Sequence, residues 1–323
     1  MFEILLHYWH RIVDLWCGSE EACDEDIEVN ILIKKILFIH GQMVSLRESE
    51  SFNEIADLFS EIRLICTRPI SDRASDLILK NPRIIEITSD LRSFCSAIET
   101  NLEKKWSLKA AGDVGSTQEE VCARIRAYPY FNTYVNLIEA ELSAMRSIEQ
   151  KPIKKIAFIG SGAMPMTSLC LIGRLTDTPT NISVLNIDRD AEALELSKVV
   201  CERLGSQAEG MEFCHAEAGT SLDLNDCDAV YLAALVGHTQ EQKEALLGQV
   251  TSKMRPGALL VTRGGRKLRS LIYTVFDPTT ERVSNLLDVA LVINPNKHNI
   301  VNSIFVGRVK QSLTSPDPEE TKD

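Results

Sequence analysis

A short glycine-rich turn is the first feature of this sequence that could do chemistry. In IAFIGSGAMPMTSL, residues 156–169, an apolar run leads directly into Gly160-Ser161-Gly162, and a helix-like stretch follows. Glycine has no side chain, so such a turn lets a ligand come close to the backbone. A dinucleotide fingerprint would place a third glycine at position 165, where this chain has Pro165. Because proline suits the first turn of a helix, the sequence predicts a ligand-binding turn without the dinucleotide pattern.

Further polar and small residues stand where later strands are expected to end. Asp188 ends ISVLNID, Glu217 follows MEFCHA, and DAVYLAALVG ends in small residues. Ligands of parallel sheets bind outside the carboxyl ends of the strands. This series predicts a site for S-adenosylmethionine: the glycine turn under methionine and ribose, Asp188 on the ribose hydroxyls and Glu217 at the adenine edge. The residues expected beside the sulfonium are Ala233, Ala234 and Leu235.

Each of these signals also has an ordinary structural explanation. Loops often use a lone G-x-G for geometry, and Asp188 could cap the helix that follows it. Glu217 could be a solvated loop residue. The argument for a ligand site rests on the series, because every member falls at the end of a strand.

Charge and cysteine usage limit the class of protein. The net charge is −11, which argues against a phosphate-binding surface, so we expect no nucleic-acid partner. Nine cysteines are scattered without a C-x-x-C pair, which favours free thiols in a reducing compartment over disulfides or metal ligands. We expect no metal site in the protein itself.

The N-terminal stretch MFEILLHYWHRIVDLW is apolar but carries Glu3, Arg11 and Asp14 at helical spacing. It lacks a basic start and a small-residue cleavage site, so it predicts an amphipathic helix and not a signal peptide. No run approaches the ~18 apolar residues that a membrane span needs. We therefore expect a cytoplasmic protein without a membrane partner; the sequence does not indicate an oligomeric state.

The two halves of the chain differ in periodicity. Residues 1–150 show apolar residues three and four apart in stretches such as SFNEIADLFSEIRLICT, which predicts an all-helical substrate or lid domain with a loop at 108–120. Residues 151–310 alternate apolar strands with helices, which predicts a parallel sheet covered on both faces. The last two strands, LLDVALVIN and VNSIFVGRV, are joined too closely to be parallel. This predicts an α/β fold of the Rossmann-like methyltransferase type, with residues 311–323 as a disordered tail.

These blocks together resemble nicotianamine synthase. The similar segments are IAFIGSGAMPMTSL, LNIDRDA, DAVYLAALVG, RPGALLVTR and VNSIFV, together with SFCSAIETNLEKKWS and YPYFNTYVNLIEAEL in the helical half. The resemblance covers roughly residues 20–310. The chain differs at Ala163-Met164-Pro165-Met166, in the loop at 108–120 and after Arg263, so the finer substrate contacts do not carry over.

The resemblance implies condensation of three S-adenosylmethionine molecules into nicotianamine, with release of three methylthioadenosines. S-adenosylmethionine would be the substrate, no other cofactor is expected, and the product would link the enzyme to metal handling. An α-amino group has a pKa of about 8, so the attacking amine must first lose a proton to a base.

Candidates for this chemistry come from the helical half and from the fifth strand. The resemblance implies Glu99 as the base and Tyr130 as the hydroxyl that orients the substrate. Glu103 lies one turn beyond Glu99 on the same helix face and stays open as the acting carboxylate. Further substrate contacts are expected from Tyr128, Tyr134, Asn136 and Arg263.

Three other functions have to be compared with this prediction. A methyltransferase with a helical substrate domain would need the same glycines and Asp188, and would release S-adenosylhomocysteine instead. Pro165 and the antiparallel strand pair argue against a nicotinamide-dependent oxidoreductase. A regulatory protein that only binds the nucleoside would leave the tyrosines of YPYFNTY unexplained.

Overall fold

The computed structural model describes residues 2–46, 52–175, 182–220, 222–294, 300 and 302–311. The chain forms two compact units, one of Met1–Cys95 with Lys267–Ile272 and the other of Ser96–Arg266 with Tyr273–Asp323. The division falls within helix α4 (Pro82–Ala111) and not near residue 150, where the change of periodicity lies. The second half of α4 and the next two helices belong to the sheet-containing unit, because they bury their apolar residues with it.

The first unit is helical. It contains α1 (Phe2–Ser45), α2 (Phe52–Thr67), α3 (Asp72–Leu79), the first half of α4 and the 3-10 turn η2 (Lys267–Leu271). Its fully buried side chains include Ile36, Ile62 and Ile78, at the apolar positions of their helices. Among the described residues, no helix is both long and apolar enough to cross a membrane.

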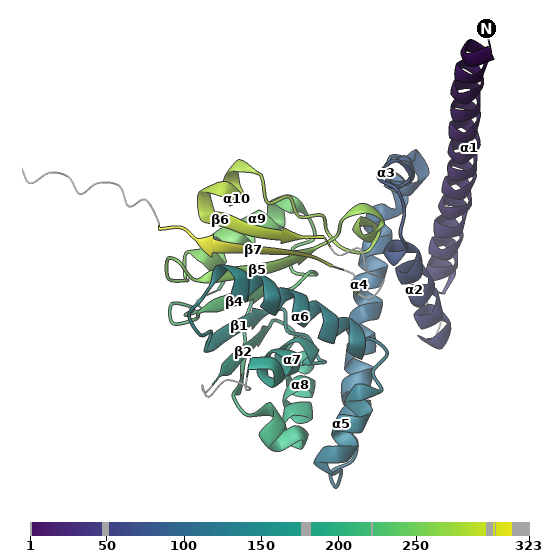
Figure 1. The fold of residues 1–323 in the computed structure, drawn as a ribbon. Helices are drawn as coiled ribbons and strands as arrows, with labels where there is room; N and C mark the ends of the chain where they lie inside the picture. The colour runs from purple at the N-terminus through teal and green to yellow at the C-terminus, as the bar shows by residue number, and fades with distance from the viewer. Residues whose placement is uncertain are drawn as a thin grey trace, which may run out of the picture. The chain divides into compact units, whose positions relative to one another are not determined.

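A seven-stranded sheet forms the centre of the second unit, in the order β3-β2-β1-β4-β5-β7-β6. The first five strands are parallel, and β7 is antiparallel to both β5 and β6 (Figure 1). This confirms the predicted Rossmann-like fold and its antiparallel end. The strands are β1 (Lys155–Ile159), β2 (Ser183–Asp188), β3 (Met211–His215), β4 (Ala229–Leu232), β5 (Leu259–Gly264), β6 (Leu287–Ile293) and β7 (Ser303–Val309).

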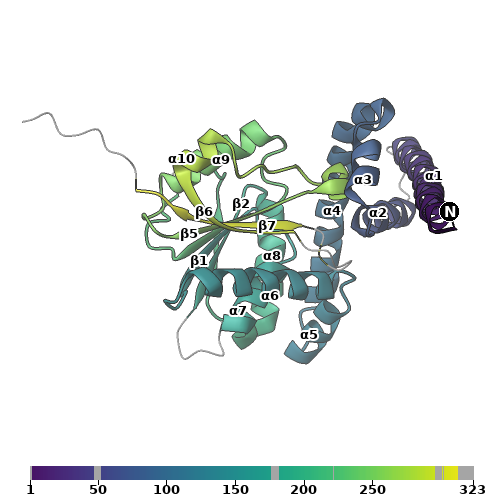
Figure 2. The same cartoon turned by 45° about the horizontal axis from the view of Figure 1, so that its top comes forward.

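Helices cover both faces of the sheet. α6 (Phe131–Ile148) and α7 (Met166–Leu175) pack on one face, and α9 (Gln240–Thr251) and α10 (Glu281–Leu286) on the other (Figure 2). In β1, Ile156 and Phe158 face α6 and α7, whereas Ala157 and Ile159 face α9. Successive side chains of a strand point to opposite faces, so a strand buried on both faces is a continuous apolar run.

The loop that was expected at residues 108–120 is shorter. α4 continues to Ala111, and α5 (Gln118–Arg126) starts directly after Thr117. The Thr117 side chain accepts from the backbone amide of Glu120, and the Glu120 carboxylate accepts from that of Thr117. This capping box begins the helix earlier than periodicity indicated. Most of the tail expected at 311–323 lies outside the described residues.

One buried ion pair joins α6 to the end of β5. The guanidinium of Arg263 donates to both carboxylate oxygens of Glu141, at 2.7 and 2.9 Å, and to the hydroxyl of Thr167 at 3.2 Å. The Glu141 side chain is fully buried and that of Arg263 nearly so. Removing one partner of a desolvated pair leaves an uncompensated charge in the interior.

We therefore expect Glu141→Gln to lower the free energy of unfolding by about 3–5 kcal/mol. Urea denaturation of the full chain measures the change. The matched control is Glu139→Gln. Glu139 lies two residues before Glu141 on α6 and forms a surface ion pair with Arg174. Exposed pairs contribute at most about 1 kcal/mol. Equal effects of the two substitutions would contradict a structural role for the buried pair.

Candidate functional site

A cavity of about 850 Å³ lies at the carboxyl ends of the parallel strands. This is the edge where ligands of such sheets bind, and the volume suits a ligand larger than a single amino acid. Most of the residues predicted from the sequence line it, namely Glu99, Tyr134, Gly160, Ser161, Gly162, Asp188, Glu217, Ala233, Ala234, Leu235 and Arg263. Tyr128, Tyr130 and Asn136 are not among the lining residues.

The glycine turn is shaped for close approach. Gly160 and Gly162 have φ angles of +79° and +70°, a conformation that other residues adopt only with strain. A side chain at position 162 would also collide with the carboxylate of Glu103. The turn therefore needs glycine both for its backbone conformation and to admit a carboxylate from α4.

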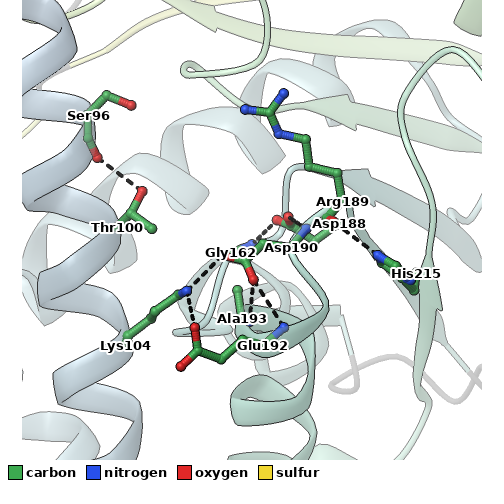
Figure 3. A network of polar contacts seen from close by, with 10 residues as sticks. All are labelled: Ser96, Thr100, Lys104, Gly162, Asp188, Arg189, Asp190, Glu192, Ala193 and His215. Carbon is green, nitrogen blue, oxygen red and sulfur yellow. Dashed lines mark hydrogen bonds and ion pairs between the residues drawn. The ribbon is translucent and has the colours of Figure 1, made fainter.

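Asp188 is held by backbone amides and does not cap the following helix. Its carboxylate accepts from the amide of Gly162 at 2.7 Å and from that of Asp190 at 2.9 Å (Figure 3). Asp190 is the N-cap of α8 (Ala191–Leu204), so the alternative raised for Asp188 applies to its neighbour. Each carboxylate oxygen of Asp188 retains a second lone pair for a ligand.

Lys104 ties α4 to the start of α8. Its ammonium group lies 2.8 Å from the carboxylate of Asp190 and 2.5 Å from that of Glu192 (Figure 3). The hydrogen bond from Lys104 lowers the pKa of Asp190, and the bonds to Asp190 and Glu192 raise the pKa of Lys104. This contact fixes the segment of α4 that carries Glu103.

Glu103 has the most perturbed carboxyl group of the site. Burial, with a further contribution from the charges of Glu99 and Asp188, raises its pKa to about 8. The hydroxyl of Tyr134 donates to its Oε1 at 3.1 Å. Burial also raises the pKa of Tyr134 well above the usual value, so the phenol stays protonated and remains a donor. A carboxyl group with a pKa near neutrality can take up and release a proton, as a general base requires.

Glu99 has a different partner. The hydroxyl of Tyr273 lies 3.0 and 3.3 Å from its two carboxylate oxygens. Both residues line the cavity, and Glu99 lies one turn of α4 before Glu103. The structure thus places two carboxylates, each with a tyrosine hydroxyl, on the wall of one cavity, and a cationic ligand would be favoured there.

The tyrosine rings of YPYFNTY mostly pack against other aromatic rings. The ring of Tyr128 makes edge contacts with Trp106 and Tyr130, both at 5.5 Å between centroids, and stacks on Tyr134. Only Tyr134 of these tyrosines reaches the cavity. Arg263, which was expected to pair with a substrate carboxylate, already has a protein carboxylate partner in Glu141.

Lys243 is a buried residue that the sequence analysis did not single out. Its ammonium group donates to the carbonyl oxygens of Ala234, at 3.2 Å, and Arg263, at 2.8 Å. Burial lowers its pKa to about 7. Lys243 thereby ties the small-residue loop after β4 to β5. In the sequence it reads as an ordinary surface lysine of an amphipathic helix.

Tyr273 and Asn302 line the cavity, and neither was singled out from the sequence. Tyr273 follows η2, outside any regular element, and its partner is 174 residues away. Asn302 directly precedes β7. Its position at the ligand edge could have been predicted from the sequence, because an antiparallel strand begins at the edge where its parallel neighbours end.

The fold and the cavity together define a class, the Rossmann-like α/β proteins with a ligand cavity at the carboxyl ends of the parallel strands. A family model described as nicotianamine synthase protein matches residues 23–314. The chain therefore belongs to the nicotianamine synthase family.

Relatives support this membership over most of their length. A nicotianamine synthase of Solanum lycopersicum is 30% identical over 280 residues, covering 86% of this chain and 84% of the relative. Nicotianamine synthase 9 of Hordeum vulgare is 29% identical over 296 residues, covering 90% and 83%. A crystal structure of a glutamate-to-glutamine mutant of MtNAS in complex with S-adenosylmethionine has a TM-score of 0.70 at 18% identity, covering 86% of this chain and 98% of that one. At that identity the likeness concerns the fold.

We expect Gly162→Ala to destabilise the protein by about 1–2 kcal/mol through its left-handed φ angle, and to displace the carboxylate of Glu103. Thermal unfolding measures the loss. The control is Gly173→Ala in α7, where an added methyl group meets no atom within 4 Å. In a helix that change should stabilise by about 0.5–1 kcal/mol. A neutral Gly162→Ala variant would contradict the described turn.

Proposed function

We propose that this protein condenses three molecules of S-adenosylmethionine into nicotianamine, releasing three methylthioadenosines, and that Glu103 accepts the proton of the attacking amine. Family membership supports the reaction. One observation carries the assignment of the base: Glu103 is the carboxyl group at the glycine turn whose pKa burial raises to about 8.

The cavity suits a sulfonium nucleoside without phosphates. The glycine turn allows close approach, and Asp188 retains lone pairs for the ribose hydroxyls. The hydroxyl oxygen of Ser161 is buried on the cavity wall without a hydrogen-bond partner among the described residues, so a ligand group would satisfy it. Glu217 lies at the adenine end in this arrangement, and Ala233 to Leu235 leave space beside the sulfonium.

Each transfer forms a carbon–nitrogen bond and breaks a carbon–sulfur bond. The amine lone pair attacks the methylene carbon next to the sulfonium, and the electrons of the broken bond make the sulfur a neutral thioether. The amine proton passes to Glu103. Holding nitrogen and carbon in line replaces an encounter in solution, which lowers the barrier.

The neighbouring groups adjust Glu103 for this step. A bound sulfonium or ammonium cation stabilises its carboxylate form, so substrate binding opposes the effect of burial on its pKa. Tyr134 donates to Glu103 and orients it. We assign Glu99, held by Tyr273, to electrostatic stabilisation of the cationic substrate. Tyr128 and Tyr130 support Tyr134 by ring packing.

The cellular setting that we propose is the cytoplasm, with no cofactor besides the substrate. The described cysteines are free, and burial raises the pKa of Cys66 and Cys201 to about 12, so both remain unreactive thiols. The described residues contain no group of three or more potential ligands that could hold a metal ion. The metal chemistry would belong to the product, as a chelator in metal homeostasis.

Incubating the purified protein with S-adenosylmethionine alone tests the reaction class. We expect methylthioadenosine and a product of the mass of nicotianamine, both identified by mass spectrometry. S-adenosylhomocysteine formed only after an acceptor is added would instead identify a methyltransferase. Absence of both nucleosides would refute the proposed reaction.

Separate substitution of Glu103 and Glu99 by glutamine tests which of them is the base. We expect Glu103→Gln to lower kcat by about 100- to 10,000-fold, since a positioned base contributes that much, and Glu99→Gln to have a smaller effect. The wild-type kcat/KM should rise with pH through about 8, as the Glu103 carboxyl group loses its proton. Residual activity of Glu103→Gln should lack this dependence beyond that of the substrate amine. A larger kcat loss in Glu99→Gln would transfer the role to Glu99.

A further inference from the structure

Asn302 carries an unpaired polar group on the cavity wall. Its side-chain nitrogen is buried and has no hydrogen-bond partner among the described residues, and the residue as a whole is 8% exposed. Buried polar groups in folded proteins are nearly always paired, by protein, water or ligand. Because Asn302 lines the cavity, a bound ligand can supply the missing acceptor.

The topology explains how Asn302 reaches the ligand edge. β7 is antiparallel to β5, and Ser303 pairs with Gly264, the last residue of β5. The residue before β7 therefore lies just beyond the carboxyl end of β5, at the same edge as the glycine turn. An asparagine before a parallel strand would lie at the opposite edge.

The cavity that Asn302 lines contains further donors from which an anion could accept. Arg263, at the end of β5, and Thr167, in α7, line the same cavity. The hydroxyl of Thr167 accepts from Arg263 at 3.2 Å, which leaves its own proton available for donation. The Asn302 amide offers two further N–H donors. Glu141 balances the charge of Arg263, so this end of the cavity provides neutral donors beside a compensated ion pair.

This group of donors lies away from the nucleoside. In the strand order, four steps separate β2, which carries Asp188, from β7. At ~4.8 Å between neighbouring strands this amounts to roughly 19 Å. Glu103 is closer, because Tyr134 and Glu141 lie on one face of α6 and link its carboxylate to Arg263 over about 10 Å of helix.

We propose that Asn302 and Thr167 bind a carboxylate of the acceptor, the amino-acid chain whose amine is deprotonated at Glu103. This assignment rests on the proposed function and adds to it a site for the second substrate. The donor nucleoside occupies the β1–β3 side of the cavity, and the acceptor carboxylate lies at the ends of β5 and β7. In this arrangement the acceptor amine faces the sulfonium carbon.

Two ligands separate the two sites in a binding experiment. Nicotianamine carries the carboxylates and no nucleoside, whereas methylthioadenosine carries the nucleoside and no carboxylate. Calorimetry would measure both with the wild-type protein, Asn302→Ala and Asn302→Asp, with nicotianamine titrated into protein saturated with methylthioadenosine. Asn285→Ala, on the exposed side of α10, is the matched control.

We expect Asn302→Ala to weaken nicotianamine binding about tenfold or more, as loss of a hydrogen bond to a charged group does. Asn302→Asp should weaken it further by repulsion, and methylthioadenosine binding should not change. Equal loss of both ligands would indicate a structural role and overturn the inference, as would unchanged nicotianamine binding in both variants. A wild-type protein that makes nicotianamine without binding it measurably would also overturn the inference. A wild-type protein that releases no methylthioadenosine would refute the proposed function itself.

Discussion

The site depends on one steric constraint: position 162 has no side chain, and the carboxylate of Glu103 occupies the space that a side chain would fill. The positive φ angle of Gly162 turns its amide toward Asp188, and its bare Cα admits Glu103 from α4. One residue therefore connects the strand ends that line the cavity with a carboxyl group from a helix. Any side chain there would displace the proposed base, strain the turn, or do both.

The surroundings of Glu103 at this turn determine its pKa. Burial raises the pKa of Glu103, and the charges of Glu99 and Asp188 raise it further. Carboxylates that lie close together disfavour each other's charged form, and a nearby sulfonium or ammonium group would relieve this repulsion. The cavity is thus better suited to its cationic ligands than to solvent. The proposed binding site and the proposed proton acceptor depend on the same arrangement.

At the far side of the cavity, the Arg263–Glu141 pair performs a different task. It is buried and bidentate, so it holds α6 against the end of β5 and fixes the helix face that carries Tyr134. Lys243 adds a second connection, from α9 to the carbonyl groups of Ala234 and Arg263. Both contacts use charged groups to position neighbouring elements. Asn302, whose amide nitrogen has no protein partner among the described residues, differs from them in this respect.

The sequence by itself determined the fold class and marked the strand ends that line the cavity. Apolar runs between helical stretches indicated the parallel sheet, the short link between the last strands indicated their antiparallel pairing, and strand ends marked Gly160, Asp188 and Ala233. These are local signals, because the period of a strand or helix and the residue at its end are properties of adjacent positions. The different surroundings of Glu99 and Glu103, the partners of Tyr273 and Arg263, and the position of Tyr134 instead of Tyr130 at the cavity wall were decided by the tertiary structure. Two carboxylates one turn apart share a helix face. Long-range contacts distinguish their surroundings: Tyr134, 31 residues away in the sequence, contacts Glu103, and Tyr273, 174 residues away, contacts Glu99.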